Sequence, residues 1–355
     1  MKIKQRQLFF FLACVAPVGK LVLLPSDLVF RAKNDLIFPA LANLLLQAAV
    51  IFLVLLLCKR EKSLFALLEE SVGRIAATII VVILSLFLLY AAILPLNEQK
   101  LMVQSVFYDT LPSLVVFSPF FLFGAYLCSK PLFCLGRVWD ILGPVAIVSF
   151  IGIIVFALGG TDFKALQPAG AAGAAGFFGG TAFTMSWFFD SVLVLSLVGK
   201  VEYKKGIAWK GLLCYLAGAA AVILFLAVFY AVYGELAVSR LFAFSKISRY
   251  FSGISVLGRI DYLFIYALGL VMAFYSVMPV QAAVDTLGDA FGHKKKLTPV
   301  LSTAFNVMFL VLAFLLNFQY QSMQKFISEY AFWIFPLFTL VLPPLFLLTR
   351  RKSRE

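Results

Sequence analysis

Long apolar runs separated by short polar connections dominate this chain of 355 residues. A helix needs about 20 apolar residues to cross the hydrocarbon core of a bilayer, and ten segments approach that length, some with interruptions. Strand-like alternation is absent, so we expect membrane helices rather than a barrel. The expected spans lie near residues 8–30, 36–58, 75–96, 112–129, 138–158, 172–199, 210–233, 257–284, 297–318 and 330–349.

Composition strengthens the membrane assignment. Hydrophobic residues make up 63% of the chain and charged residues 13%, and the mean hydropathy is +1.01. A soluble domain cannot bury that much apolar surface, so lipid must be the solvent. Since the pattern shows no Ser- or Pro-rich linker, we expect one membrane domain over 1–355. Its longest outer connections are expected at 97–111, 159–171 and 234–256.

Basic residues predict the orientation. The chain ends and the loops on their side of the membrane hold 20 of the 30 Lys and Arg residues, and the opposite loops hold eight. The richer side is cytoplasmic by the positive-inside rule, so both termini are expected inside. The net charge of +13 is therefore read as a topology signal. Because it is spread over short loops, we expect no nucleic-acid partner.

Candidate chemistry is sparse outside the membrane. Five cysteines lie in or beside apolar spans without CxxC spacing, which favours buried structural thiols over a metal site. No GxSxG, HExxH or phosphate-loop string occurs. The sequence therefore predicts no enzyme, no metal and no cofactor.

The first span carries a charge beside a helix break. Its sequence is FFFLACVAPVGKLVLLPSDLVF, in which Pro17 and Gly19 precede Lys20. Pro17 removes a backbone donor and Gly19 lowers helix propensity. A lysine near the middle of a membrane helix costs about 2.5–3.5 kcal/mol on insertion scales unless it is paired or lines a polar cavity. A broken helix with a charge at the break is typical of a transporter-type binding site.

The sixth span repeats that pattern. GAAGAAGFFGGTAFTMSWFFDSVLVLSLVGK holds five glycines and then a deep acid, Asp190. The small residues favour either tight helix packing or a second discontinuous helix. Spans one and six are equivalent members of two five-helix halves. We therefore expect an all-α membrane protein of two inverted repeats, at about 1–158 and 168–349, with helices 1 and 6 broken.

Depth arithmetic relates the two charges. Arg6 and Lys200 are both expected at the cytoplasmic side. Counted along each helix at 1.5 Å per residue, Lys20 is about 21 Å from Arg6, and Asp190 is about 15 Å from Lys200. We hypothesise that Lys20 and Asp190 are coupled. The alternatives are that each meets water or a carbonyl separately, or that Asp190 is protonated. Freed backbone at 16–19 and 179–189 is expected to line one cavity for a small zwitterion. The expected ligand-binding residues are Ala16, Pro17, Gly19, Lys20, Gly179, Gly180, Trp187 and Asp190.

The connection at 234–256 contains an amphipathic stripe. Leu241, Phe244, Ile247 and Phe251 recur at spacings of three, three and four residues. This spacing predicts a helix at the outer surface, with its apolar face either in lipid or packed on the protein.

Five strings along the chain are informative together: RQLFFFL, VGKLVLLPSDL, DFKALQPAG, LPPLFLLTRRKSRE and GRIDYLF at 258–264. In their order and spacing they resemble the spore germination permease family, the GerAB-type B subunits of germinant receptors within the amino acid–polyamine–organocation superfamily. In GRIDYLF, Arg259 and Asp261 match the family's basic and acidic positions, and Gly258 replaces its first acid. Lys20 stands where many members have a small residue. The resemblance implies a structural or coupling role for Arg259 and Asp261, for which a helix-start anchor is the alternative.

The resemblance also implies a function. A subunit of this kind binds a small germinant, such as an amino acid, in the spore inner membrane or cell membrane. It acts with an A-type membrane subunit and a C-type lipoprotein to trigger germination. The alternatives are a proton- or cation-coupled amino-acid transporter and a membrane scaffold without a ligand.

Overall fold

The computed structural model describes residues 2–60, 62–107, 113–250, 261–292, 297–315 and 333–344, and also residues 322, 325–326 and 329–330. Within these ranges the chain is helical, and its β pairing is one isolated bridge between Ile3 and Val201. The all-α prediction is therefore confirmed for the described residues.

The first part of the chain forms seven α-helices between its N-terminus and residue 158. Short 3-10 turns at Lys33–Asp35 and Cys58–Arg60 connect some of them. The helices are α1 (Gln5–Val18), α2 (Leu24–Ala32), α3 (Ile37–Leu57), α4 (Leu64–Val72), α5 (Arg74–Phe107), α6 (Ser113–Cys128) and α7 (Leu132–Leu158).

The second part begins with the 3-10 turn Phe163–Leu166 and contains a second interrupted helix. Its helices are α8 (Gly173–Thr184), the 3-10 turn Met185–Trp187, α9 (Asp190–Ser196), α10 (Ile207–Tyr233), the 3-10 turn Gly234–Ser239, α11 (Ala243–Tyr250), α12 (Asp261–Phe291), α13 (Leu297–Leu315) and α15 (Ile334–Pro336), which continues as a π-helix over Leu337–Val341.

Six of these helical segments are long and apolar enough to cross a membrane. They are Ile37–Leu57, Arg74–Gln104, Leu132–Leu158, Gly173–Ser196, Ile207–Ser239 and Tyr262–Phe291. Four shorter apolar segments accompany them at Gln5–Val18, Phe117–Cys128, Leu297–Ala313 and Ile334–Pro344. A chain with this many apolar helices is a multi-pass membrane protein.

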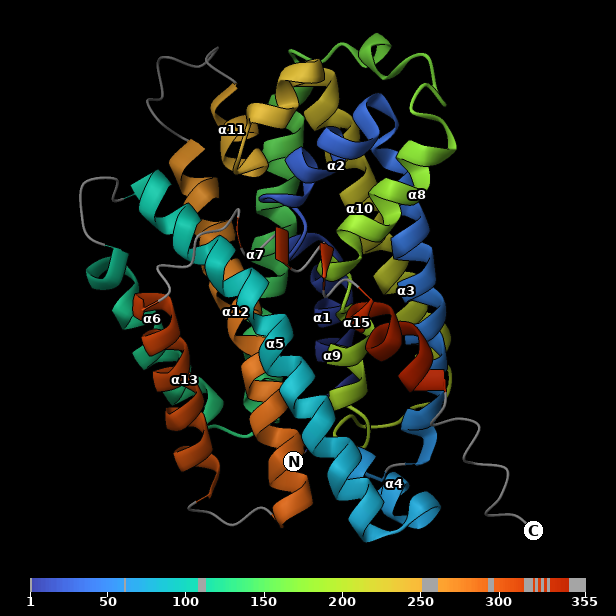
Figure 1. Ribbon diagram of the computed structural model, residues 1–355, viewed down its shortest axis with the longest axis vertical. Helices are drawn as coiled ribbons and strands as arrows, with labels where there is room; N and C mark the ends of the chain where they lie inside the picture. Colours follow the sequence, from blue (N-terminus) through green and yellow to red (C-terminus); the bar gives the residue numbers. More distant parts are fainter. Residues whose placement is uncertain are drawn as a thin grey trace.

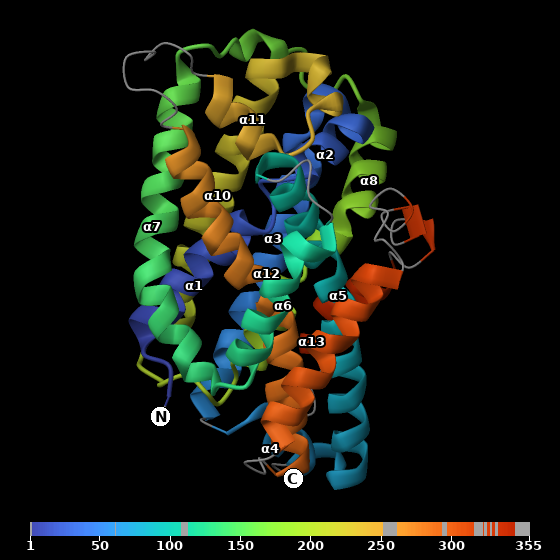
Figure 2. The same ribbon diagram turned by 90° about the vertical axis from the view of Figure 1, so that its left-hand side faces the viewer.

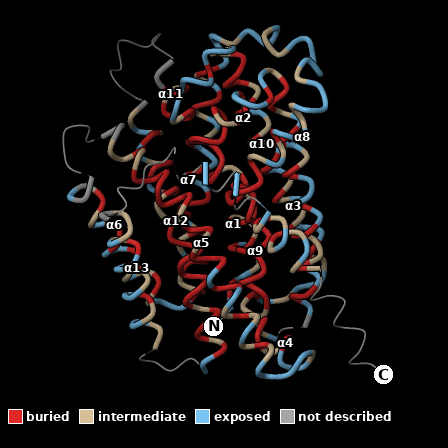
Figure 3. Tube along the Cα trace, viewed as in Figure 1, coloured by how far each residue is buried: buried red, intermediate tan, exposed pale blue. Residues whose placement is uncertain are grey.

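The helices form a bundle with the interrupted pair at its centre. α4 and the N-terminus lie at one end, and α2 and α11 lie at the other (Figures 1 and 2). α1 packs against α7 and α10, α12 packs against α5, and α6 pairs with α13 on one side. Buried residues concentrate along α1, α9, α5 and α12, while the outer helices expose one face (Figure 3).

The expected connection at 97–111 is wrong for residues 97–107, because α5 continues through them. Pro95 lies inside this helix. A proline removes one helical hydrogen bond, but neighbouring side chains can satisfy the freed carbonyl in a membrane helix. The carbonyl freed in this way is that of Ala91, one turn earlier. The hydroxyl of Ser276 donates to the carbonyl oxygen of Pro95 itself at 3.1 Å, so α12 is bonded to α5 beside the proline.

α11 packs its apolar stripe on the protein. Phe244 and Ile247 are buried, whereas Leu241 is exposed, and Phe251 lies outside the described residues. The helix contacts α7 and α12. Of the two roles left open by the sequence, the packed surface helix fits the two buried positions.

Candidate functional site

Two helix interruptions lie at the centre of the molecule. α1 ends at Val18 and α2 begins at Leu24, so residues 19–23 are not helical. The second interruption runs from Met185 to Phe189, between α8 and α9. Pro17 in the last turn of α1 disfavours a continuous helix here.

Both interruptions lie later in the sequence than expected. Ala16 and Pro17 are still helical, and the freed backbone of the first span starts at Gly19. Gly179 and Gly180 belong to regular helix in α8 rather than to a break. Small residues are compatible with a membrane helix when neighbouring helices approach closely, so glycine alone did not mark the break.

A fully buried ion pair joins the two interruptions. The Nζ atom of Lys20 lies 2.9 Å from Oδ1 and 2.8 Å from Oδ2 of Asp190, and both side chains are 0% exposed. The hydroxyl of Tyr215 on α10 donates to Oδ2 at 2.8 Å. The Lys20 ammonium also lies 5.1 Å from the centroid of the Phe188 ring. The two side chains that were predicted to be coupled are therefore in direct contact.

This pair is a strong constraint on the central helices. Removing two charges from water costs several kcal/mol per ion, and only close, multiply bonded geometry offsets that penalty. Here the carboxylate of Asp190 accepts hydrogen bonds from the ammonium and from the Tyr215 hydroxyl. Loss of one partner leaves an uncompensated charge in the membrane interior, which is strongly unfavourable.

Neighbouring elements satisfy backbone groups of the first interruption. The amide of Leu23 donates to Oε1 of Glu98 at 2.8 Å. The amides of Ala243 and Phe244, at the start of α11, donate to the carbonyl oxygens of Val22 at 2.8 Å and Leu21 at 3.1 Å. These two carbonyls are therefore hydrogen-bonded to the start of α11, which links α11 directly to the first interruption.

Glu98 is a site residue that the sequence reasoning missed. It is 1% exposed and lies within α5, although residues 97–111 were expected to be a loop. The detectable signal was the polar string NEQK between two apolar stretches, which fits a membrane helix facing a polar interior.

Polar side chains of α3 support the second interruption. Oε1 of Gln47 accepts from the amide of Ser191 at 2.9 Å. The side-chain amide of Asn43 donates to the carbonyl oxygen of Thr181 at 3.0 Å. The hydroxyl of Ser191 donates to the carbonyl oxygen of Thr339 at 2.9 Å. The interruption is thus held from two sides.

Several buried polar atoms beside the interruptions have no hydrogen-bond partner among the described residues. They are the hydroxyls of Ser186 and Tyr275, the indole nitrogen of Trp187 and both side-chain polar atoms of Asn97. An unsatisfied buried group costs about 1–3 kcal/mol, so it is typically paired with a ligand or water in function. Tyr275 lies directly beside Gly19, where an added Cβ would be 2.5 Å from its ring.

The structure brings some expected site residues together and not others. Lys20, Asp190, Gly19 and Trp187 lie at the interruptions, with Trp187 2% exposed. Gly179 is exposed, and Gly180 packs against Pro39, with an added Cβ 2.9 Å from its Cγ atom. Arg259 is outside the described residues, and Asp261 is the first residue of α12.

A second charged cluster lies after α9, toward the end that carries the N-terminus. Lys200 pairs with Asp285 and, at 3.0 Å, with Asp289 of α12. Burial lowers the pKa of Lys200, but the two carboxylates outweigh it, so the pKa stands above its ordinary value. The N-terminal segment is also attached here, because the amide of Ile3 donates to the carbonyl oxygen of Lys200 at 2.8 Å. Charge and backbone contacts therefore join the N-terminal segment, the residues after α9 and α12 at this end of the bundle.

The apolar helices, the two interruptions and the buried charges between them define a permease-like integral membrane protein. The model of the spore germination protein family matches residues 2–346, and the chain belongs to that family. The resemblance seen in the sequence is therefore confirmed. A comparison with curated proteins finds no match.

Proposed function

We propose that this chain binds a small germinant, such as an amino acid, between the interrupted helices and signals with partner subunits. The proposal includes one domain of ten spans in two inverted five-helix repeats, with both termini cytoplasmic. Membership of the spore germination family supports a role in the inner membrane of the spore. An A-type membrane subunit and a C-type lipoprotein are the proposed partners.

The observation that carries this proposal is the buried Lys20–Asp190 pair. A zwitterion can take its place without changing the net charge of the site. The ligand carboxylate would pair with the Lys20 ammonium, and the ligand ammonium with the Asp190 carboxylate. One ion pair then becomes two, so neither charge is left without a partner.

Unsatisfied groups near the pair favour the same class of ligand. The hydroxyls of Ser186 and Tyr275 and the indole nitrogen of Trp187 are buried polar groups with hydrogen-bonding capacity to offer. A small polar molecule can use such groups, whereas a purely apolar one would leave them unpaired.

In the proposed mechanism, a structural change at the ion pair is transmitted to α11 at the surface of the bundle. Separation of Lys20 from Asp190 would move the first interruption, whose carbonyls at Leu21 and Val22 are bonded to α11. α11 lies on the proposed outer side of the bundle (Figure 1). Its displacement is the proposed signal to the partner subunits.

Thermal unfolding of the purified full chain against a panel of the standard amino acids tests ligand binding. At least one should raise the midpoint in the parent chain and fail to do so in Asp190→Asn and Lys20→Met. Arg6→Gln is the control, because Arg6 lies in the first turn of α1, at the opposite end of that helix from the interruption, and forms an exposed pair with Asp140. Retention of the shift in both site variants would place the ligand elsewhere.

Spores provide the functional readout. In spores that rely on this receptor, germination should require a higher germinant concentration when Gly19 or Lys20 is replaced. Purification from spore membranes should recover the A- and C-type subunits with the chain. Normal germination after deletion, in the absence of a paralogue, argues against the role.

Glu98 favours the second candidate, a proton- or cation-coupled amino-acid transporter. It is a buried acid bonded to the first interruption, and buried membrane carboxylates often serve as proton or ion sites. Uptake of a labelled amino acid by liposomes containing only this chain would support transport. Glu98→Gln keeps an acceptor oxygen for Leu23 but loses the charge, so it should abolish a coupled flux selectively.

A further inference from the structure

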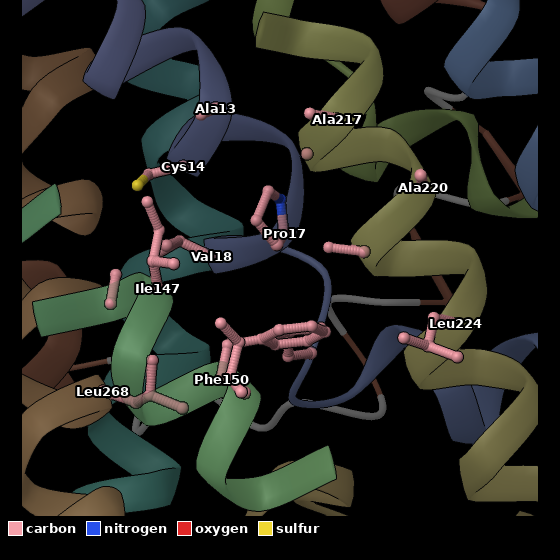
Figure 4. A pocket seen from close by; sticks show the side chains of 15 residues that line it. Ala13, Cys14, Pro17, Val18, Ile147, Phe150, Ala217, Ala220, Leu224 and Leu268 are labelled. Atoms are coloured by element: carbon pink, nitrogen blue, oxygen red, sulfur yellow. The ribbon is translucent and has the colours of Figure 1, made fainter. Parts of the chain in front are cut away.

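A groove of about 380 Å³ lies between α1, α7 and α10. Side chains from all three helices border it, with Pro17 and Phe150 projecting toward the space (Figure 4). Neither Lys20 nor Asp190 lines it. The lining residues are Ala13, Cys14, Pro17 and Val18 of α1, Leu21 of the first interruption, Ala146, Ile147, Phe150 and Ile151 of α7, Ala217, Gly218, Ala220, Ala221 and Leu224 of α10, and Leu268 of α12.

Small side chains on α10 explain why the groove exists. Ala217, Ala220 and Ala221 reach only a short way toward α7, so they leave space that larger residues would fill. Gly218 lets α10 approach α1, since an added Cβ would lie 2.4 Å from the carbonyl oxygen of Ala13. α10 is therefore close to α1 while the space toward α7 remains open.

The groove opens toward the bilayer. Ile147 and Ile151 of α7 are 40% and 54% exposed, and Leu224 of α10 is 45% exposed. All three lie within segments that are long and apolar enough to span the membrane. The groove is thus continuous with the lipid-facing surface of the bundle.

Its chemistry excludes water and polar ligands. The 15 lining residues are apolar apart from the thiol of Cys14, which itself lies 4.0 Å from the carbonyl oxygen of Gly143. A water molecule needs two to four polar partners to remain in a cavity. An aliphatic chain needs none, and it gains dispersion contacts with the walls.

We propose that this groove binds one acyl chain of a membrane phospholipid. The bound chain contacts Pro17 and Val18, the last two residues of α1 before the first interruption. It therefore supports the end of α1 from the lipid side, beside the close approach of α1 to α10 at Gly218. A movement of α1 at the interruption requires the acyl chain to shift or leave, so lipid occupancy opposes that movement. The inference concerns a lipid site and stands independently of the proposed germinant site.

Photolabelling of the full chain tests the proposal. The chain is reconstituted in nanodiscs with a phospholipid that carries a diazirine in the middle of one acyl chain. After irradiation and digestion, mass spectrometry should locate label preferentially on residues 147–151 and 217–224. Uniform labelling of these segments and of other lipid-facing helices, such as α3 and α13, would overturn the site.

Groove-filling variants sharpen the test. Ala220→Phe places a ring in the groove and should lose most of the label from both segments. Ala217→Leu is a milder filling variant that should lose part of it. Ala49→Phe adds the same ring at an exposed position of α3 and should keep the labelling pattern. Labelling unchanged in a folded Ala220→Phe or Ala217→Leu chain contradicts the proposal.

A partner helix is the competing occupant. In native membranes, a photoreactive probe attached at Ala220→Cys should react with phospholipid. A cross-link to another membrane protein in place of lipid would identify the groove as a subunit interface and overturn the acyl-chain site.

Discussion

At the scale of single residues, the Lys20–Asp190 pair determines the largest expected effects. Lys20→Met or Asp190→Asn leaves one buried charge without its partner, which destabilises a protein by about 3–5 kcal/mol. The double variant removes both charges and should be more stable than the sum of the single changes predicts. Thermal unfolding of the purified chain gives all four corners of the double-mutant cycle.

The exposed pair between Arg6 and Asp140 supplies the control for this cycle. The Arg6 side chain is 73% exposed, so its ion pair is worth about 0–1 kcal/mol. Arg6→Gln should therefore shift the midpoint little. Additive defects for Lys20→Met and Asp190→Asn would show that the two charges are energetically independent.

Tyr215 makes a separate contribution to the same carboxylate. Tyr215→Phe removes the donor to Asp190 without changing the packing, and a hydrogen bond to a charged group contributes about 1.5–3 kcal/mol. Tyr233→Phe is the matched control, because its hydroxyl donates to the neutral carbonyl of Lys246. We expect the larger fall in unfolding midpoint for Tyr215→Phe, and equal falls would argue against a charged acceptor.

At the scale of elements, the first interruption depends on space at Gly19. Gly19→Ala would place a methyl group 2.5 Å from the Tyr275 ring, so either α12 or the interruption must shift. We expect lower stability and a weakened response to any amino acid that binds the parent chain. Tyr275→Leu in the same chain should recover part of the stability.

Gly179→Ala is the control for this substitution. No atom lies within 4 Å of an added Cβ at Gly179, and the residue is in regular helix, where alanine is favoured over glycine. Stability should be unchanged or slightly higher. If Gly179→Ala lowers the stability as much as Gly19→Ala does, the contact with Tyr275 is not the reason for the effect at Gly19.

The elements also explain how far the sequence alone could lead. A charge beside Pro17 and Gly19 predicted the first interruption, and the depth of two unlike charges predicted their pairing. Gly179 and Gly180 misplaced the second interruption, because glycines allow both breaks and close packing. Glu98 was missed because residues 97–111 were expected to form a connection, whereas α5 continues through Pro95 to Phe107.

At the scale of the whole molecule, the uneven distribution of basic residues predicts cytoplasmic termini. In a background without native cysteines, Lys2→Cys should resist an impermeant maleimide added outside intact cells. Lys164→Cys, in the exposed turn before α8, should react. The reverse pattern would invert the proposed topology, and permeabilised cells should label both positions.

The ion pair between distant helices has a consequence for synthesis. Lys20 and Asp190 are 170 residues apart, so at 5–20 residues per second a ribosome reaches the acid roughly 10–30 s after the lysine. During that interval Lys20 lacks the carboxylate that it contacts in the folded chain, so the first helix is less stable in lipid. A chain stopped after Leu158 should label with maleimide at Ala16→Cys, whereas the complete chain, in which Ala16 is 0% exposed, should not. If the stopped chain is also protected from maleimide, the first helix becomes buried without the second half of the protein, and the prediction is wrong.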